Sequence, residues 1–304
     1  IARVDAESDG SLPRSCDSMK KIGIDVGGTA VKIGYFVDGS LIECKRYAQI
    51  DNLDAFRELL RHSDITAFID DSFIGAGVGV PGVVDGNCVQ DCPNIKWLEK
   101  IDMVQVLADS LGENYKYNLD NDANVAALGE SVAGAGVNHP SFVFITIGTG
   151  IGGGLIVDGN IYHGPGGMAG EIGHIGTGHS LACNCGAIGC VEAIASASNI
   201  EKRAHGKPLP EIIEAAKSGD NESIQLLKES GAALGEAISQ IALLLDIRVF
   251  VFGGGGAPCL EMWQPHINKV IDARCFGRSS DDFTVIQASL GNEAGVCGAA
   301  ALVG

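Results

Sequence analysis

Phe142-Val-Phe-Ile-Thr-Ile147, followed by Gly148-Thr-Gly-Ile-Gly-Gly-Gly154, is the stretch that decides the fold of this chain. The first run has the β-branched and aromatic content of a buried strand. A second apolar run, Leu155-Ile-Val157, follows the glycines, and an Asp158-Gly159 turn closes it. The pattern predicts a strand, a tight glycine turn and a returning strand.

The first part of the chain follows the same plan. Ile22-Gly-Ile-Asp-Val26 predicts a short buried strand, Gly27-Gly28-Thr29 a turn, and residues 30–37 a returning strand. Other runs predict strands at residues 41–47, 73–80, 115–119, 249–252 and 284–288, and helices at residues 54–62, 104–111, 123–134, 211–217, 222–245 and 293–302. This internal duplication predicts two related α/β lobes with a cleft between them.

Composition narrows the class of protein. The chain has 304 residues, of which 43 are glycine, and only 19% are charged, which is typical of a compact, turn-rich α/β enzyme. The net charge of -17 argues against nucleic acid or an anionic membrane as the main partner, because both need a basic surface. No apolar run reaches the length of about eighteen residues that a membrane span needs.

Residues 1–18 differ from the rest of the chain. They are polar, begin without Met and lack the apolar core of a signal peptide. We interpret them as a non-native or disordered extension and expect Met19 to be the natural start.

Cysteine usage predicts a metal site. Three of the ten cysteines, Cys183, Cys185 and Cys190, fall within eight residues and follow His174, whereas the others are scattered. Scattered cysteines argue against a disulfide scaffold, so we expect a reducing, cytoplasmic location. Three thiolates and one imidazole are the ligand set of a closed, tetrahedral structural zinc site. The spacing differs from that of zinc fingers and leaves His179 as an alternative fourth ligand.

Two glycine turns have the composition of a phosphate site. Asp25-Val-Gly-Gly-Thr29 follows a strand, and Gly148-Thr149-Gly150 repeats the arrangement. Glycines let the backbone approach a phosphate, Thr29 offers a hydroxyl, Lys32 a cation, and Asp25 a carboxylate that holds Mg²⁺ through water. A plain hairpin turn is the alternative for each taken alone. Together the two turns predict a grip on one triphosphate.

A dinucleotide site is the rival interpretation of the second turn. Gly148, Gly150 and Gly153 match G-x-G-x-x-G, and Glu171 lies near the distance of a ribose-binding acid. In that motif the glycines open a helix, whereas the residues after Gly153 predict a strand, and the chain contains no Walker A sequence. The later run Gly253-Gly-Gly-Gly256 predicts either a helix entry or a flat surface for an adenine ring.

Acidic residues follow two of the predicted strands. Asn121-Asp122 marks a strand end that turns into a helix; a helix N-cap is the simpler interpretation, but an aspartate in this position of an α/β cleft also suits a general base. Glu171, His174 and Glu192 come after the second glycine turn. Carboxylates bind vicinal hydroxyls well because each oxygen accepts, although either glutamate alone is also explained as a solvated surface acid.

With these motifs, residues 19–304 resemble the ROK family (repressor, open reading frame, kinase), specifically its sugar kinases of bacterial glucokinase type. The resemblance is carried by Asp25-Val-Gly-Gly-Thr29 with Lys32, Pro81-Gly82, Asn121-Asp122, Gly148-Thr-Gly150, Gly170-Glu-Ile-Gly-His174 and Cys183-x-Cys-Gly-x-x-Gly-Cys-x-Glu192. It implies an actin-like, ribonuclease-H-like fold of two lobes with a central cleft. We expect the lobes at residues 19–121 and 122–304, with the zinc loop in the second and the last helix packed back on the first.

The resemblance also implies an activity and its residues. The chain would be an ATP-dependent hexose kinase acting on the 6-hydroxyl of glucose or a close relative, with Mg²⁺ and structural Zn²⁺. Asp122 would be the catalytic base, and the sugar would be bound by Gly82, Asn121, Glu171, His174 and Glu192, with His174 also a zinc ligand. The nucleotide would be bound by Asp25, Gly27, Gly28, Thr29, Lys32, Gly148, Thr149, Gly150, Gly254 and Gly255.

Other functions stay open at this level. N-acetylmannosamine or N-acetylglucosamine kinase is the nearest alternative, and an oxidoreductase or a non-catalytic sugar-binding regulator belongs to another class. Repressor members of the family carry an N-terminal helix-turn-helix, which we expect to be absent here because so few residues precede Ile22. The family habit would be a homodimer or homotetramer.

Overall fold

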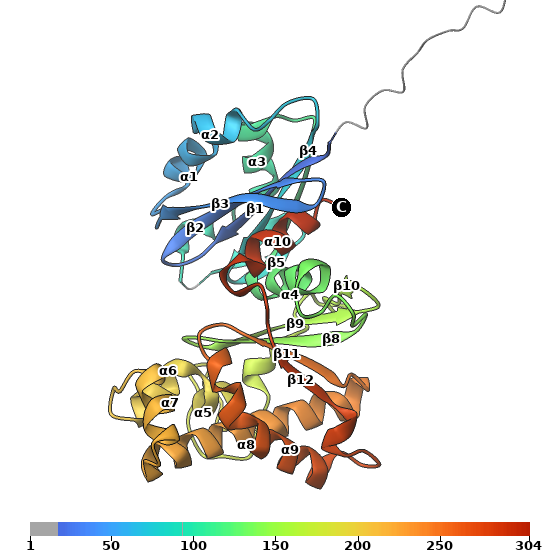
Figure 1. Ribbon diagram of the computed structural model, residues 1–304. Helices are drawn as coiled ribbons and strands as arrows, with labels where there is room; N and C mark the ends of the chain where they lie inside the picture. Colours follow the sequence, from blue (N-terminus) through green and yellow to red (C-terminus); the bar gives the residue numbers. More distant parts are fainter. Residues whose placement is uncertain (1–17, 93) are drawn as a thin grey trace, which may run out of the picture.

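Two five-stranded mixed sheets form the framework of the protein (Figure 1). The structure is a computed structural model that describes residues 18–92 and 94–304, so the interpretation of residues 1–18 lies, apart from Ser18, outside the described part. The strand orders are β3-β2-β1-β4-β7 and β10-β9-β8-β11-β12. In each sheet the first three strands pair antiparallel and the other two join in parallel, which confirms the predicted duplication.

The three central strands of the first sheet are apolar runs whose side chains are mostly buried, whereas its two edge strands are more polar and more exposed. Its strands are β1 (Lys20–Val26), β2 (Ala30–Val37), β3 (Ser40–Ala48), β4 (Phe73–Val80) and β7 (Lys116–Asn121). A small hairpin, β5 (Val83–Asp85) and β6 (Cys88–Asp91), follows β4. The sheet shares one core with α1 (Leu53–Leu60), α2 (Ser63–Thr66) and α3 (Met103–Leu111). These helices therefore leave the opposite face of the sheet free for other elements.

The second sheet carries a larger helical layer. Its strands are β8 (Phe142–Ile147), β9 (Ile151–Val157), β10 (Asn160–Ile161), β11 (Val249–Gly253) and β12 (Thr284–Gln287). Its main core includes residues of α5 (Val191–Ala195), α6 (Ala197–Arg203), α7 (Leu209–Lys217), α8 (Asn221–Leu245) and α9 (Leu260–Arg274). In Figure 1 these helices lie below the sheet.

Two helices, α4 (Asp122–Ala133) and α10 (Ala294–Ala301), lie between the sheets (Figure 1). Helix α10 packs on β1 and β4 as well as on α4, although it is the last element of the chain. Glycines make this close packing possible: a Cβ at Gly23 would lie 2.0 Å from the carbonyl oxygen of Val296, and one at Gly77 would lie 1.9 Å from that of Ala299. The predicted helix at residues 293–302 thus returns to the first sheet.

Most predicted elements are present, with differences where the pattern is weak. The glycine turn is shorter than predicted, because β9 already begins at Ile151 and glycines 152–154 belong to the strand. Helix α9 was not predicted; it contains Pro265, and its polar and apolar residues are poorly segregated. The helix predicted at residues 54–62 corresponds to α1, and the short helix α2, which follows it, was not predicted.

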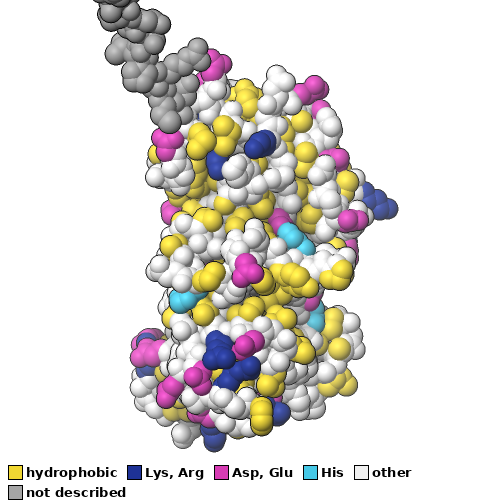
Figure 2. All heavy atoms as spheres, turned by 90° about the vertical axis from the view of Figure 1, so that its right-hand side faces the viewer, with side chains coloured by type: hydrophobic (Ala, Val, Ile, Leu, Met, Phe, Trp, Pro, Cys, Tyr) yellow, Lys and Arg dark blue, Asp and Glu magenta, His cyan; other side chains and the backbone are white. Residues whose placement is uncertain are grey.

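The distribution of charged side chains on the surface is consistent with the net negative charge of the chain. On the face in Figure 2, Lys and Arg side chains lie singly or beside acidic ones, and the described residues form no continuous basic stripe there. Among the described residues, no helix combines the length and hydropathy needed to cross a membrane.

Candidate functional site

A cavity of about 450 Å³ lies between the sheets and takes its lining from distant parts of the chain. Its walls come from the end of β4, the junction of β7 and α4, the turn between β8 and β9, and the segment around Glu171. Eight of the predicted site residues line it: Gly82, Asn121, Asp122, Gly148, Thr149, Gly150, Glu171 and Glu192. The fold therefore gathers the residues predicted to bind sugar, except His174, in one cavity together with the second phosphate turn.

Asn121 occupies the N-cap of α4, as the simpler interpretation of the sequence predicts. Its side-chain oxygen accepts the backbone N–H of Ala123 at 2.9 Å, and its Nδ2 donates to the carbonyl oxygen of Gly82 at 2.8 Å. An amide nitrogen has two hydrogens, so one N–H remains free to point to a ligand. The capping role and the predicted role in sugar binding are thus compatible.

Asp122 begins α4, and its side chain is open to the cleft. Its Oδ1 accepts its neighbour's backbone N–H, from Ala123, at 2.8 Å. The carboxyl group lies deep between the two sheets, and this removal from bulk water raises the pKa of Asp122 to about 6; the negative charge of Asp25 adds to the rise. A base whose pKa is close to neutral pH is well suited to take a proton from a hydroxyl.

A second cavity, of about 220 Å³, meets the first at Asp122. Asp122, Ala123 and Thr146 line both cavities. The second cavity also contains Asp25 and Lys32, whose Oδ2 and Nζ lie 3.1 Å apart. A carboxylate and an ammonium group thus share this smaller cavity with Asp122, and both are polar groups suited to a bound phosphate and its cation.

The turn at Gly148–Gly150 is held by Glu192. The Oε2 of Glu192 accepts the backbone N–H of Ile151 at 2.8 Å, and a Cβ at Gly150 would lie 2.4 Å from the same oxygen. Only glycine therefore fits at position 150 without displacing the carboxylate. One carboxylate contacts the turn and lines the sugar-sized cavity at the same time.

Four predicted metal ligands converge beside the cavity. One ligand atom from each of His174, Cys183, Cys185 and Cys190 lies within 4.8 Å of the others; the Sγ atoms of Cys185 and Cys190 are 3.6 Å apart, and Cys183 Sγ is 3.9 Å from His174 Nδ1. Tetrahedral zinc with Zn–S bonds of about 2.3 Å places its sulfur ligands on the order of 3.8 Å apart. The arrangement fits such an ion.

The nitrogens of His179 are both engaged elsewhere. Its Nδ1 accepts the backbone N–H of Leu181 at 3.1 Å, and its Nε2 lies 3.0 Å from the carbonyl oxygen of Cys190. The ring therefore braces the cysteine loop from outside the ligand cluster. His174 presents the opposite geometry, because Nδ1 faces Cys183 while Nε2 lies 3.9 Å from Glu171 Oε2.

Some predicted residues stay outside the two cavities. Gly27, Gly28 and Thr29 form the turn between β1 and β2, and only the residues that flank it, Asp25 and Lys32, line the smaller cavity. Gly254 lines the smaller cavity, but Gly255 does not. His174 lies behind Glu171 instead of in the lining.

Other residues of the cleft were missed by the sequence analysis. Glu130 is fully buried, lines the smaller cavity and accepts the backbone N–H of Leu290 at 2.9 Å, so it holds the connection from β12 to α10. Its position two helical turns after Asp122, on the same face of α4, was an available signal. A Cβ at Gly295 would lie 2.7 Å from Cγ of Asp25, a contact that no local pattern predicts.

Comparison of the sequence with known proteins places the chain among sugar kinases and their relatives. The model of the ROK family matches residues 21–304. A glucokinase of Halalkalibacterium halodurans is 33% identical over 317 residues, covering 93% of this chain and 94% of the relative. An N-acetyl-D-glucosamine kinase of Pasteurella multocida is 28% identical over 306 residues, covering 93% and 98%.

A solved structure gives the same match in three dimensions. The ROK family glucokinase from Streptomyces griseus, in complex with glucose and AMPPNP, superimposes with a TM-score of 0.74 at 28% identity, covering 93% of this chain and 98% of that one. The predicted actin-like, ribonuclease-H-like fold is thereby confirmed. The family model, the curated relatives and the shared fold together show that this chain belongs to the ROK family.

Proposed function

We propose that this protein is an ATP-dependent hexose kinase that transfers the γ-phosphoryl group of ATP to the 6-hydroxyl of glucose or a close relative. The observation that carries the proposal is the meeting of two cavities at Asp122, one lined by sugar-binding types of side chain and the other by Asp25 and Lys32. The relatives named glucokinase and the complex with glucose and AMPPNP support it. We also propose that the chain divides into two lobes, residues 19–121 and residues 122–304.

The larger cavity holds the sugar in this proposal. Glu171 and Glu192 accept hydrogen bonds from ring hydroxyls, and the free N–H of Asn121 donates one. Gly82 has φ of +103° and its added Cβ would lie 2.1 Å from the carbonyl oxygen of Asp91, so the backbone, not a side chain, forms this wall. The sugar is thus oriented with its reactive hydroxyl toward Asp122.

Asp122 accepts the hydroxyl proton as the new oxygen–phosphorus bond forms. The N–H groups of Thr149 and Gly150 and the Nζ of Lys32 stabilise negative charge on the phosphoryl oxygens, whereas the N–H of Gly148 donates to the carbonyl oxygen of Gly150. Asp25, one of the carboxylates that line the smaller cavity, would hold Mg²⁺, and the ion would supply positive charge that neutralises the phosphoryl oxygens. Closure of the cleft would exclude water that otherwise hydrolyses ATP.

The cluster of His174 with three cysteines would hold zinc in a structural role. All four ligand positions are occupied by protein, so no position is open for substrate. The ion would fix the loop that ends at Glu192, and Glu192 Oε1 lies 4.0 Å from Cys183 Sγ. The four ligands would thereby influence sugar binding through the position of Glu192 when zinc is held.

An N-acetylhexosamine kinase is the second candidate, and a specific feature favours it. A further cavity of about 790 Å³ joins the sugar cavity through the shared residues Gly82, Asn121 and Glu171. This space gives room for a substituent larger than a hydroxyl group. The relative named N-acetyl-D-glucosamine kinase supports the same alternative.

A coupled ADP-release assay across glucose, mannose, fructose, allose, N-acetylglucosamine and N-acetylmannosamine tests the proposal. We expect release of ADP that depends on both sugar and Mg²⁺, with the highest kcat/KM identifying the substrate. Sugar binding without ADP release would show a regulator instead, and a sugar-dependent change in nicotinamide absorbance would show an oxidoreductase.

The pH dependence of the reaction should report the base. Because the pKa of Asp122 is raised to about 6, the carboxyl group is fully ionised at higher pH. It becomes protonated, and can no longer act as a base, as the pH falls through that value. We expect log(kcat/KM) for the sugar to be level above the pKa and to fall with a slope of one below it. A profile that stays level down to about pH 5 would contradict the assignment, and the residual activity of Asp122→Asn should lack this limb.

A further inference from the structure

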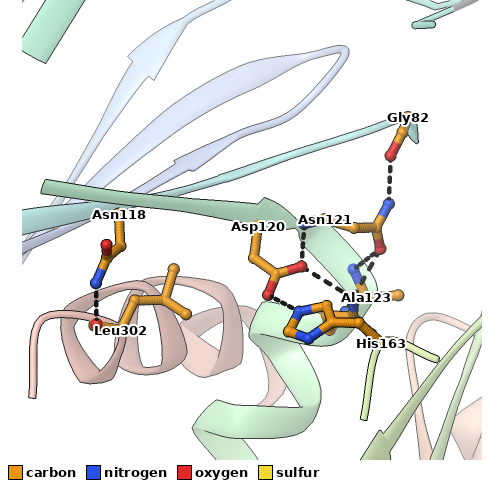
Figure 3. A network of polar contacts seen from close by, with 8 residues as sticks. Gly82, Asn118, Asp120, Asn121, Ala123, His163 and Leu302 are labelled. Carbon is orange, nitrogen blue, oxygen red and sulfur yellow. Dashed lines mark hydrogen bonds and ion pairs between the residues drawn. The ribbon is translucent and has the colours of Figure 1, made fainter. Parts of the chain in front are cut away.

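A histidine–aspartate pair lies next to the sugar site but outside its lining. It joins the segment that carries Asn121 and Asp122 to the segment that leads to Glu171. Nε2 of His163 and Oδ2 of Asp120 lie 2.6 Å apart, although the residues are 43 positions apart in the chain (Figure 3). Asp120 lies in β7, one residue before Asn121, which is both the last residue of the strand and the N-cap of α4. Asp120 is 5% exposed, whereas the side chain of His163, just after β10, is 49% exposed. The pair lines the 790 Å³ cavity, and neither member lines the cavity that contains Asp122.

The carboxylate of Asp120 organises the segment that carries the base. Its Oδ1 accepts the backbone N–H of Asn121 at 2.7 Å and the Nδ2 of Asn124 at 2.9 Å, and its Oδ2 faces His163 (Figure 3). A buried carboxylate needs such donors, because an unpartnered charge is costly away from water. His163 is the one donor in this set that does not come from β7 or α4.

The backbone of His163 holds the segment that leads to Glu171 by a hydrogen bond. The carbonyl oxygen of His163 accepts the backbone N–H of Ala169 at 3.0 Å, two residues before Glu171. The intervening loop contains Gly164 with φ of +70° and Gly167 with φ of +73°, so its backbone has much conformational freedom to lose. One residue thus closes this loop through its backbone and binds β7 through its ring.

We propose that His163 and Asp120 form a positioning pair that sets the distance between the two arms of the sugar site. One arm is Asn121 with Asp122, and the other is Glu171. The inference rests on the proposed sugar site, and it assigns to these residues no contact with the sugar ring in the 450 Å³ cavity. Because Asp120 accepts, Nε2 of His163 must carry a hydrogen, which is true of one neutral tautomer and of the charged ring.

Removal of the ring donor should loosen sugar binding in particular. In His163→Phe a ring of similar size remains, but Oδ2 of Asp120 loses this hydrogen bond and the glycine loop loses its side-chain anchor. We expect the glucose Kd and the sugar KM to rise about tenfold, the scale of one lost charge-assisted hydrogen bond that orients a site. The Kd for ATP should change less than about twofold, since Asp25, Lys32 and the glycine turns are not contacted.

His163→Gln is the rescue variant, because its amide can place an N–H near the position of Nε2. We expect it to recover most of the sugar affinity. His62→Phe is the matched control: His62 is 53% exposed, also lies near an aspartate, with its Nδ1 3.8 Å from Asp64, and lines neither cleft cavity. It should leave both affinities unchanged.

Titration calorimetry measures the Kd for ATP and for glucose, or for the sugar of the panel that binds most tightly. Thermal melting of the same variants measures their stability, and the two methods together separate the outcomes. A tenfold loss of sugar affinity in His163→Phe, restored in His163→Gln, supports the pair. A lower melting temperature with unchanged sugar affinity, or an equal loss for sugar and ATP, overturns it. Wild-type protein that binds sugar but releases no ADP refutes the kinase proposal alone, and wild-type protein that binds no sugar refutes both.

Discussion

Asp122→Asn is expected to lower kcat by at least about 10²-fold, which is the lower end of the effect of losing a general base. The amide keeps an oxygen that can accept the backbone N–H of Ala123, as Asp122 Oδ1 does at 2.8 Å, so the start of α4 should be preserved. It cannot take up the hydroxyl proton. ATP affinity should change by less than about twofold, because this substitution leaves Asp25, Lys32 and the glycine turns in place.

Steady-state kinetics with the sugar from the panel, together with ATP titration, measure this effect. Asp102→Asn is the matched control, since Asp102 likewise stands at the start of a helix, where it accepts the backbone N–H of Gln105 at 2.9 Å, and lines neither cleft cavity. The control should retain wild-type kcat. A near-normal kcat in Asp122→Asn would remove Asp122 from the role of base, whatever the control does.

Cys185→Ser and Cys190→Ser are expected to lose the metal and a large part of the stability together. An ion that binds only the folded state at a hundred times its Kd stabilises that state by about 2.7 kcal/mol. For a chain of this size that corresponds to a fall in Tm of roughly 4 °C. Sugar affinity should fall as well, because the loop that carries Glu192 would no longer be held.

Metal content after purification without chelator, and thermal melting of the same samples, test this prediction. Cys44→Ser is the control for Cys185→Ser, because both thiols are exposed and Cys44 lies on β3, outside the metal cluster. It should keep one equivalent of zinc and the wild-type Tm. If Cys185→Ser and Cys190→Ser both keep the metal and the Tm, the cluster is not the zinc site.

The local elements and the local chemistry could be predicted from the sequence. Alternating and β-branched apolar runs predicted the strands that flank both glycine turns, because side-chain period and turn residues act over a few positions. The metal cluster was also readable, since three of its ligands fall within eight residues and one short loop can bring them together. For Asn121 two roles were open, and the structure shows the N-cap directly.

The pairing of residues that are distant in the chain became visible in the folded molecule alone. The return of α10 to β1 brings Gly295 against Asp25, and the packing of α4 between the sheets puts Asp122 at the junction of two cavities. The same packing pairs Asp120 with His163 across 43 positions, and the fold of the cysteine loop turns His179 away from the metal cluster. Such contacts depend on how whole elements pack, which depends on burial summed over many residues and leaves no short pattern in the sequence.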